Sequence, residues 1–205
     1  MSRGETGPIF TGMTIHRDLE YHYSFFYAEG WYVSELDSAQ GKGVIFSPAP
    51  DDIATSFSVE ARDLGFTVEG SDLPDLRRGF KEGLRQLPGA AIERTEDSVT
   101  GKLVGLDAWH TFREGEAIRK RWTRLFYQGT VQVRLIGQGA DPAEYEFWLP
   151  AFNVSMRTFQ FGDWWADVTG VAWQPSLDAP PPGFEEEWRE RQATKAAQDK
   201  RDGDA

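Results

Sequence analysis

Alternating hydrophobic and polar positions predict the first strands of this chain. In residues 20–36, "EYHYSFFYAEGWYVSEL", aromatic rings recur at every second position from Tyr21 to Tyr27. This period of two is typical of a strand. Residues 28–30, Ala-Glu-Gly, then indicate a tight turn, and Trp31 opens a second strand that reaches Leu36. A buried aromatic ring hides about 150–250 Å². We therefore interpret the stretch as core, with an aromatic ligand cage as the alternative.

Further strands are predicted along the chain. Residues 43–46 are short and apolar, and residues 56–62 alternate, with Phe57, Val59 and Ala61 on a dry face and polar side chains on a wet one. Turns at Gly101, Gly115 and Gly129 separate four more candidates, at 91–97, 103–113, 118–127 and 131–136. This arrangement is typical of an antiparallel meander. We expect a last strand at 155–161.

Two helices interrupt the strands. Leucine or phenylalanine recurs at steps of three and four between residues 73 and 87, after a capping pair at 71–72 and before Pro88. A second apolar stripe after residue 142 runs through Tyr145, Trp148 and Phe152, with Pro150 inside it. We expect Pro150 to kink or restart that helix. Strands, helix, strands, helix and strand indicate an α+β fold with helices covering a mostly antiparallel sheet.

Composition narrows the function classes. The chain has 205 residues and a formal net charge of -11, which disfavours broad binding to nucleic acid or anionic lipid. It has no cysteine, which excludes disulfides, thiolate metal sites and cysteine nucleophiles. No apolar run reaches the length of a signal peptide or a membrane span. We therefore expect a cytoplasmic protein that does not insert into a membrane.

The sequence shows no recognisable catalytic centre. Its three histidines, His16, His22 and His110, lack the spacing of metal ligands, and His110 falls on an apolar strand face. The Asp51-Asp52 pair is typical of a solvated loop. No nucleophile elbow, Walker A loop or dinucleotide fingerprint is present. We predict no metal, no cofactor and no enzymatic activity.

One basic run falls on consecutive strands of the predicted meander. It comprises Arg113, Arg119, Lys120, Arg121, Arg124 and Arg134. Two interpretations remain open. These cations form ion pairs with Glu60, Glu93 or Glu96, or some of them form a patch for an acidic partner.

Several segments together resemble the PsbP-like and DcrB-like superfamily. They are "YSFFYAEGWYV", "VIFSPAPDDIATSFSVEARDL", a helix ending in "LPG", and "YEFWLPAFNVSMRTFQF". The resemblance covers about residues 18–161. It implies an α/β/α sandwich with a central antiparallel sheet. Known members are mostly non-enzymatic: photosystem subunits, a Ran-binding transport factor, bacterial lipoproteins and secretion chaperones. No catalytic motif carries the resemblance, so it implies a fold more than a mechanism.

The resemblance stops at the end of a domain that we place at residues 1–162. Residues 163–205 continue with clustered tryptophans, a proline linker at 180–182 and a charged helix predicted from about 184 to 198. Tryptophan is enriched at interaction hot spots. The extension therefore either folds over the sheet or docks on a partner.

These observations favour a non-catalytic accessory, adaptor or chaperone-like protein that binds another protein. A binder of a small apolar ligand between sheet and helix is the alternative, and an enzyme using carboxylates and His110 is the third hypothesis. A homo-oligomer is also compatible with the sequence. The predicted partner-binding residues are Trp164, Trp165, Trp173, Phe184, Trp188, Arg119 and Arg121.

Overall fold

The computed structural model describes residues 8, 11–38, 41–50 and 53–162. Its strands are β1 (Met13–Asp18), β2 (Tyr23–Ala28), β3 (Tyr32–Ser38), β4 (Gly41–Ser47), β5 (Ser56–Val68), β6 (Ala91–Thr100), β7 (Leu103–Glu114), β8 (Ala117–Gly139) and β9 (Gln160–Phe161). The two α-helices are α1 (Leu73–Arg85) and α2 (Pro142–Thr158). The predicted C-terminal residues from Trp164 to Trp188 lie outside the described part of the chain, as do Asp51 and Asp52.

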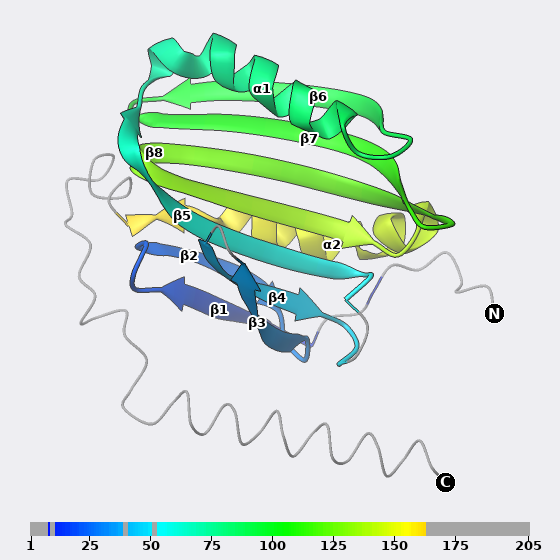
Figure 1. The fold of residues 1–205 in the computed structure, drawn as a ribbon. Coiled ribbons are helices and arrows are strands. Elements are labelled where there is room, and N and C mark those ends of the chain that lie inside the picture. Colours follow the sequence, from blue (N-terminus) through cyan, green and yellow to red (C-terminus); the bar gives the residue numbers. More distant parts are fainter. Residues whose placement is uncertain (1–7, 9–10, 39–40, 51–52, 163–205) are drawn as a thin grey trace, which may run out of the picture.

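The elements form layers around one large antiparallel sheet (Figure 1). Its order is β3-β4-β5-β8-β7-β6, and a second sheet has the order β1-β2-β9. Helix α2 packs between β2 and β8, whereas α1 lies over β6 and β7 on the other side of the large sheet. The predicted α+β class and the antiparallel sheet flanked by helices are confirmed.

Strand β8 turns back on itself at Gly129. Residues 117–128 pair with β7, and residues 129–138 pair with β5. Gly129 has a φ of 60°, a backbone conformation that glycine adopts without strain. Tyr127 and Gln132 are hydrogen-bonded across the turn at 2.9 Å. The two strands predicted at 118–127 and 131–136 are therefore the two arms of β8.

Most aromatic residues of the stretch at residues 20–36 are core, as predicted, whereas Phe26 is 40% exposed. Phe25 is 1% exposed, and its ring lies 5.4 Å from those of Phe46 and Phe57. Trp31 is 5% exposed and lies 5.3 Å from Trp148 of α2. These edge-to-face contacts join the small sheet, the large sheet and α2 into one core.

The strands on either side of Gly30 do not pair with each other. The tight turn exists, because Trp31 N donates to Ala28 O at 3.2 Å and Gly30 has a φ of 85°. However, β2 pairs with β1 and β9, whereas β3 pairs with β4. The turn therefore carries the chain from the small sheet to the large one. Strand β1 was absent from the sequence prediction.

The strand predicted at residues 155–161 is wrong for most of its length. Helix α2 continues through Pro150 to Thr158, and only Gln160 and Phe161 form β9. A proline inside a helix removes one hydrogen bond at a cost of about 3 kcal/mol. Burial of Phe152 and Met156 beyond it offsets this cost, so the helix does not restart.

Thr158 marks the end of α2. Its Oγ1 donates a hydrogen bond to Val154 O at 2.7 Å and accepts one from Phe26 N at 2.9 Å. The hydroxyl thus satisfies a carbonyl of the last helical turn and an amide of β2. This contact fixes where the helix gives way to β9.

Helix α1 covers a second, smaller core on the outer face of the large sheet. Leu73, Leu76 and Phe80 pack against Val104 and Leu106 of the sheet, together with residues of β5 and β8. The helix begins and ends close to the predicted limits. It covers the β6–β7 side of this face and the end of β5, and in the described part of the chain no helix covers the part over β4 and the first half of β5.

Candidate functional site

The uncovered part of the outer sheet face contains a groove of about 390 Å³. Side chains from β3, β4, β5, β7 and β8 line it, together with the loop before β5. They are Leu36, Ile45, Ile53, Ala54, Ser56, Ser58, Glu60, Glu114, Arg119, Arg121, Arg134, Ile136 and Gln138. Four are leucine or isoleucine, and three are arginines. The groove therefore combines aliphatic side chains, which we call its apolar wall, with three arginines and two glutamates.

Alternation along the strands explains this composition. In β5, Phe57, Val59 and Ala61 point into the main core and are fully buried. Ser58 and Glu60 fall on the opposite face, which the sequence predicted to be wet. Glu60 is only 7% exposed, because it lies among the other side chains that line the groove. The polar face of the sheet is therefore a recess and not an open solvated surface.

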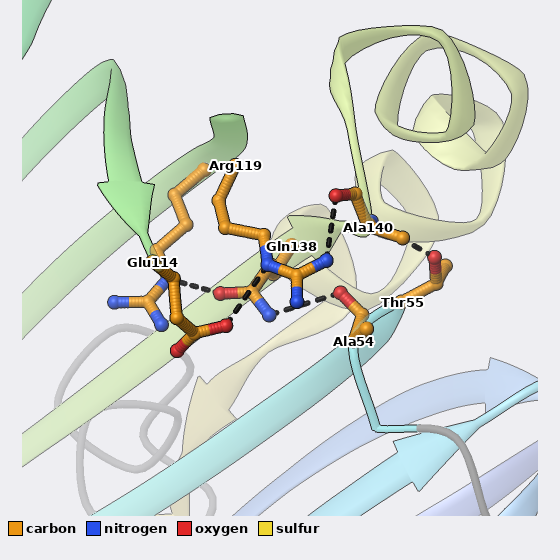
Figure 2. Close-up of polar contacts among 7 residues, drawn as sticks. Ala54, Thr55, Glu114, Arg119, Gln138 and Ala140 are labelled. Carbon is orange, nitrogen blue, oxygen red and sulfur yellow. Dashed lines mark hydrogen bonds and ion pairs between the residues drawn. The ribbon is translucent and has the colours of Figure 1, made fainter. Parts of the chain in front are cut away.

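Arg119 connects three segments at one end of the groove (Figure 2). Its Nε donates to Glu114 Oε2 at 2.9 Å, and its Nη1 donates to Ala140 O at 2.6 Å. Ala140 N in turn donates to Thr55 Oγ1 at 3.0 Å, and Gln138 Nε2 donates to Ala54 O at 2.9 Å. This network holds the loop before β5 against the end of β8.

Arg121 differs from the other two arginines of the groove. Its Nε donates to the neutral Gln138 Oε1 at 2.5 Å, and its guanidinium lies 4.3 Å from the Phe112 ring. In the described residues, no carboxylate forms an ion pair with it. Burial lowers the pKa of Arg121 to about 10, with Glu114 opposing this shift and Arg134 and Arg119 adding to it. Arg121 is thus a poorly solvated cation with aromatic support.

Arg134 forms an ion pair across the strands. Its Nη2 donates to Glu60 Oε2 at 2.5 Å. The Arg134 side chain is 44% exposed, whereas that of Glu60 is 8% exposed. The pairing with Glu60 was one of the two interpretations of the basic run. Arg134 nevertheless keeps part of its guanidinium accessible from the groove.

The predicted basic run is split between the two faces of the sheet. Arg119, Arg121 and Arg134 line the groove. Lys120 instead forms ion pairs with Glu93 and Glu146 at 3.2 and 2.9 Å, on the side of α2. Arg124 bonds to Asp107 at 2.8 Å on that same side. The split follows from the period-2 alternation of side chains along a strand.

Arg113 lies exposed near the end of β7. Glu96, the third predicted acidic partner, pairs with Arg94 and not with the basic run. The structure therefore confirms ion pairing with Glu60 and Glu93, whereas a patch for an acidic partner stays a prediction.

Sequence reasoning missed most of the groove. Glu114 and Gln138 come from different strands, and only the reversal of β8 brings Gln138 beside Arg121. The alternation of polar and apolar residues in 56–62 placed Glu60 on the groove face. The same alternation would have separated Arg119 and Arg121 from Lys120.

The histidines do not converge on a site. His16 lies among the rings of Tyr23, Phe25 and Phe46, and burial lowers its pKa to about 4. His110 is fully buried within the large sheet. Among the described residues, no group of three or more His, Asp or Glu side chains is arranged to hold a metal ion.

Within the described range, no helix is long and apolar enough to cross a membrane. This finding concerns only the helices of residues 8–162, with the gaps given above.

The comparisons with known proteins identify the fold. No family model and no curated protein sequence matches the chain. The structure is similar to the solution structure of cyanobacterial PsbP from Synechocystis, with a TM-score of 0.53 at 13% identity over 78% of this chain and 98% of that one. The chain has the PsbP-like fold. The resemblance that the sequence motifs predicted is confirmed at the level of the fold.

Two further structures are similar to this PsbP-like chain. LpqN of Mycobacterium tuberculosis, described as involved in cell envelope biogenesis, gives a TM-score of 0.47 at 14% identity over 77% of this chain and 86% of that one. The Ran-binding protein Mog1p of Saccharomyces cerevisiae gives 0.48 at 9% identity over 73% and 95%. Proteins of one fold perform unrelated functions, so these likenesses do not assign a role.

His110 predicts a specific pH dependence of stability. Its Nε2 lies 3.1 Å from Thr123 Oγ1, and burial, aided by Arg121, lowers its pKa to about 4. The unfolded state binds a proton below about pH 6.5, whereas the folded state does not until about pH 4. Stability therefore falls as the pH drops through this window, by about 1 kcal/mol per pH unit for this residue.

Urea unfolding between pH 6.5 and 4.5 gives the slope of the free energy of unfolding against pH. We expect His110→Gln to remove the contribution of His110 to this slope. His16 continues to contribute in the variant, because its pKa is lowered to a similar value. Identical slopes in the two proteins would show that His110 titrates normally in the folded state.

Proposed function

We propose that this protein is a non-catalytic accessory or adaptor protein, and that a protein partner binds the groove on the outer face of the large sheet. The observation that carries the proposal is the recess itself, lined by Arg119, Arg121 and Arg134 and by aliphatic side chains. A local cationic recess on a chain of net charge -11 is complementary to an acidic and apolar segment.

The sequence resemblance supports the same reading, because known members of the superfamily are mostly non-enzymatic. The predicted alternative, a small apolar ligand between sheet and helix, has less support. The interval between the sheet and α2 is filled by Tyr145, Phe152 and Met156, each 1% exposed or less. Interiors packed in this way leave no room for a ligand without displacement of side chains.

The test uses a matched pair of exposed isoleucines. Ile53 lies on the groove and is 57% exposed, and Ile118 is 48% exposed. Ile118 shares its strand face with Lys120, which binds α2, so it lies on the opposite side of the sheet. Both positions tolerate a carboxylate in the free protein, because both are open to water.

We expect capture from the native cell, quantified by mass spectrometry, to recover one partner with the wild type and with Ile118→Glu. Ile53→Glu should reduce recovery of that partner at least about tenfold, because binding would bury an uncompensated carboxylate. A chain truncated after Ser176 measures the contribution of the C-terminal extension. Equal recovery by Ile53→Glu and wild type, with loss in the truncated chain, would place docking on the extension and overturn the groove.

A further inference from the structure

The charges of the groove do not balance. Arg119 pairs with Glu114 and Arg134 pairs with Glu60, at 2.9 and 2.5 Å. Arg121 has only the neutral Gln138 and the Phe112 ring. Three cations therefore face two anions within the described lining. The unbalanced charge belongs to Arg121, which Gln138 and the Phe112 ring hold in place.

The donors of Arg121 are only partly used. A guanidinium carries five N–H donors in a planar fork, and the structure assigns a partner to its Nε alone. In the described residues, no protein acceptor is recorded for the two terminal Nη groups. The guanidinium carbon lies over the Phe112 ring, 4.3 Å from its centroid, and this contact restricts where the fork can lie. A carboxylate matches such a fork by accepting two parallel hydrogen bonds.

The apolar wall restricts what else the ligand carries. Leu36 of β3, Ile45 of β4 and Ile136 of β8 line the same recess as the arginines. Burying an aliphatic group against them contributes about 25 cal/mol per Å² of apolar surface removed from water. A simple anion such as phosphate would leave these aliphatic side chains exposed to water. A carboxylate beside an aliphatic group would use both features.

We propose that Arg121 is the anchor for an acidic side chain of the partner, flanked by aliphatic residues that pack on Leu36, Ile45 and Ile136. This inference rests on the proposed protein-binding function and names the chemistry of its docking segment. The paired arginines, Arg119 and Arg134, hold the groove in shape and add to its positive potential.

The probe is a peptide, acetyl-Leu-Glu-Ile-amide, with acetyl-Leu-Gln-Ile-amide as its isosteric control. Both are titrated into the full chain, and nitrogen-15 NMR follows the Nε–H resonance of Arg121. We expect the glutamate peptide to bind at least about tenfold more tightly than the glutamine peptide, because a charge-assisted bidentate pair is lost. Raising the salt concentration should reduce the difference in affinity between the two peptides.

Variants separate the anchor from the net charge. Arg121→Gln should weaken binding of the glutamate peptide at least about tenfold, and Arg121→Lys should give an intermediate affinity because the fork is lost while the charge is kept. Arg78→Gln removes the same charge from an exposed site on α1, where the side chain is 72% exposed, and should leave the affinity unchanged. Circular dichroism confirms that each variant is folded.

Four results would overturn the inference. They are equal affinity for the two peptides or no binding of either at millimolar concentration, an equal effect of Arg78→Gln and Arg121→Gln, and tighter binding of hexanoate than of the glutamate peptide. The last result would assign the groove to a small carboxylate. Failure of the peptide test with an Ile53-dependent partner would refute the anchor alone. Peptide binding without any captured partner would refute the proposed function.

Discussion

Replacing Trp31 with alanine should lower the free energy of unfolding by about 3–5 kcal/mol. The side chain is 5% exposed, and its ring lies 5.3 Å from Trp148 and 6.2 Å from Phe152. It therefore connects the turn between the two sheets to α2, and its removal leaves a cavity among large rings. Urea unfolding at pH 7 measures the loss, which is a large share of a typical total of about 5–15 kcal/mol.

Phe66→Ala is the matched control for this substitution. Phe66 is also aromatic but is 62% exposed, so its loss should change the free energy of unfolding by less than about 0.5 kcal/mol. A loss below about 1 kcal/mol for Trp31→Ala would contradict the role of this ring in the core.

Replacing Asp107 with alanine should cost a similar amount, about 3–5 kcal/mol. Its Oδ1 accepts hydrogen bonds from Trp122 Nε1 at 2.6 Å and from Arg124 Nε at 2.8 Å. Arg124 Nη1 also donates to Met156 O at 2.8 Å, which links the sheet to α2. Without the carboxylate, the indole N–H of Trp122 and the Nε–H of the largely buried Arg124 both lose their acceptor, and the charge of Arg124 loses its counterion.

Asp75→Ala tests whether burial causes this effect. Asp75 pairs with Arg78 at 2.7 Å, but both side chains are more than 70% exposed. We expect a change of no more than about 0.5 kcal/mol in urea unfolding. Comparable losses for Asp75→Ala and Asp107→Ala would show that the Asp107 network has no special weight.

Period-2 alternation predicted the strands that have one packed face. Phe57, Val59 and Ala61 are fully buried, and His110 lies on the apolar face of β7 as expected. The burial of Trp31 near Trp148 was also predictable, because a large ring beside a turn needs a buried surface. The burial of these side chains follows from local patterns, whereas the contact between Trp31 and Trp148 joins residues that are distant in the chain.

Strand pairing was not predictable in the same way. The turn at Gly30 looks like that of a hairpin, yet β2 and β3 belong to different sheets. Hydrogen-bond partners depend on distant strands, here β1, β4 and β9. Helix α2 likewise extends through Pro150 because tertiary burial outweighs a local penalty.

The candidate site was likewise predictable only in part. Arg119 and Arg121 were predicted to bind a partner, and the structure places both in the groove. Gln138 was not assigned to the same place, because the predicted strand ended at residue 136 and its contact with Arg121 depends on the register across the predicted turn at Gly129. Odd and even positions of one strand can be assigned to opposite faces of the sheet from the sequence alone. Which residues of different strands lie side by side depends on the register in which the strands pair.

Photo-crosslinking in the native cell tests most directly whether the groove is the binding surface. Benzoylphenylalanine replaces Ile53 on the groove or Ile118 on the opposite face, which are 57% and 48% exposed. We predict one discrete crosslinked protein from position 53 that is lost in the Arg121→Gln background, and none from position 118. A crosslink to the same protein from position 118 alone would contradict the central claim.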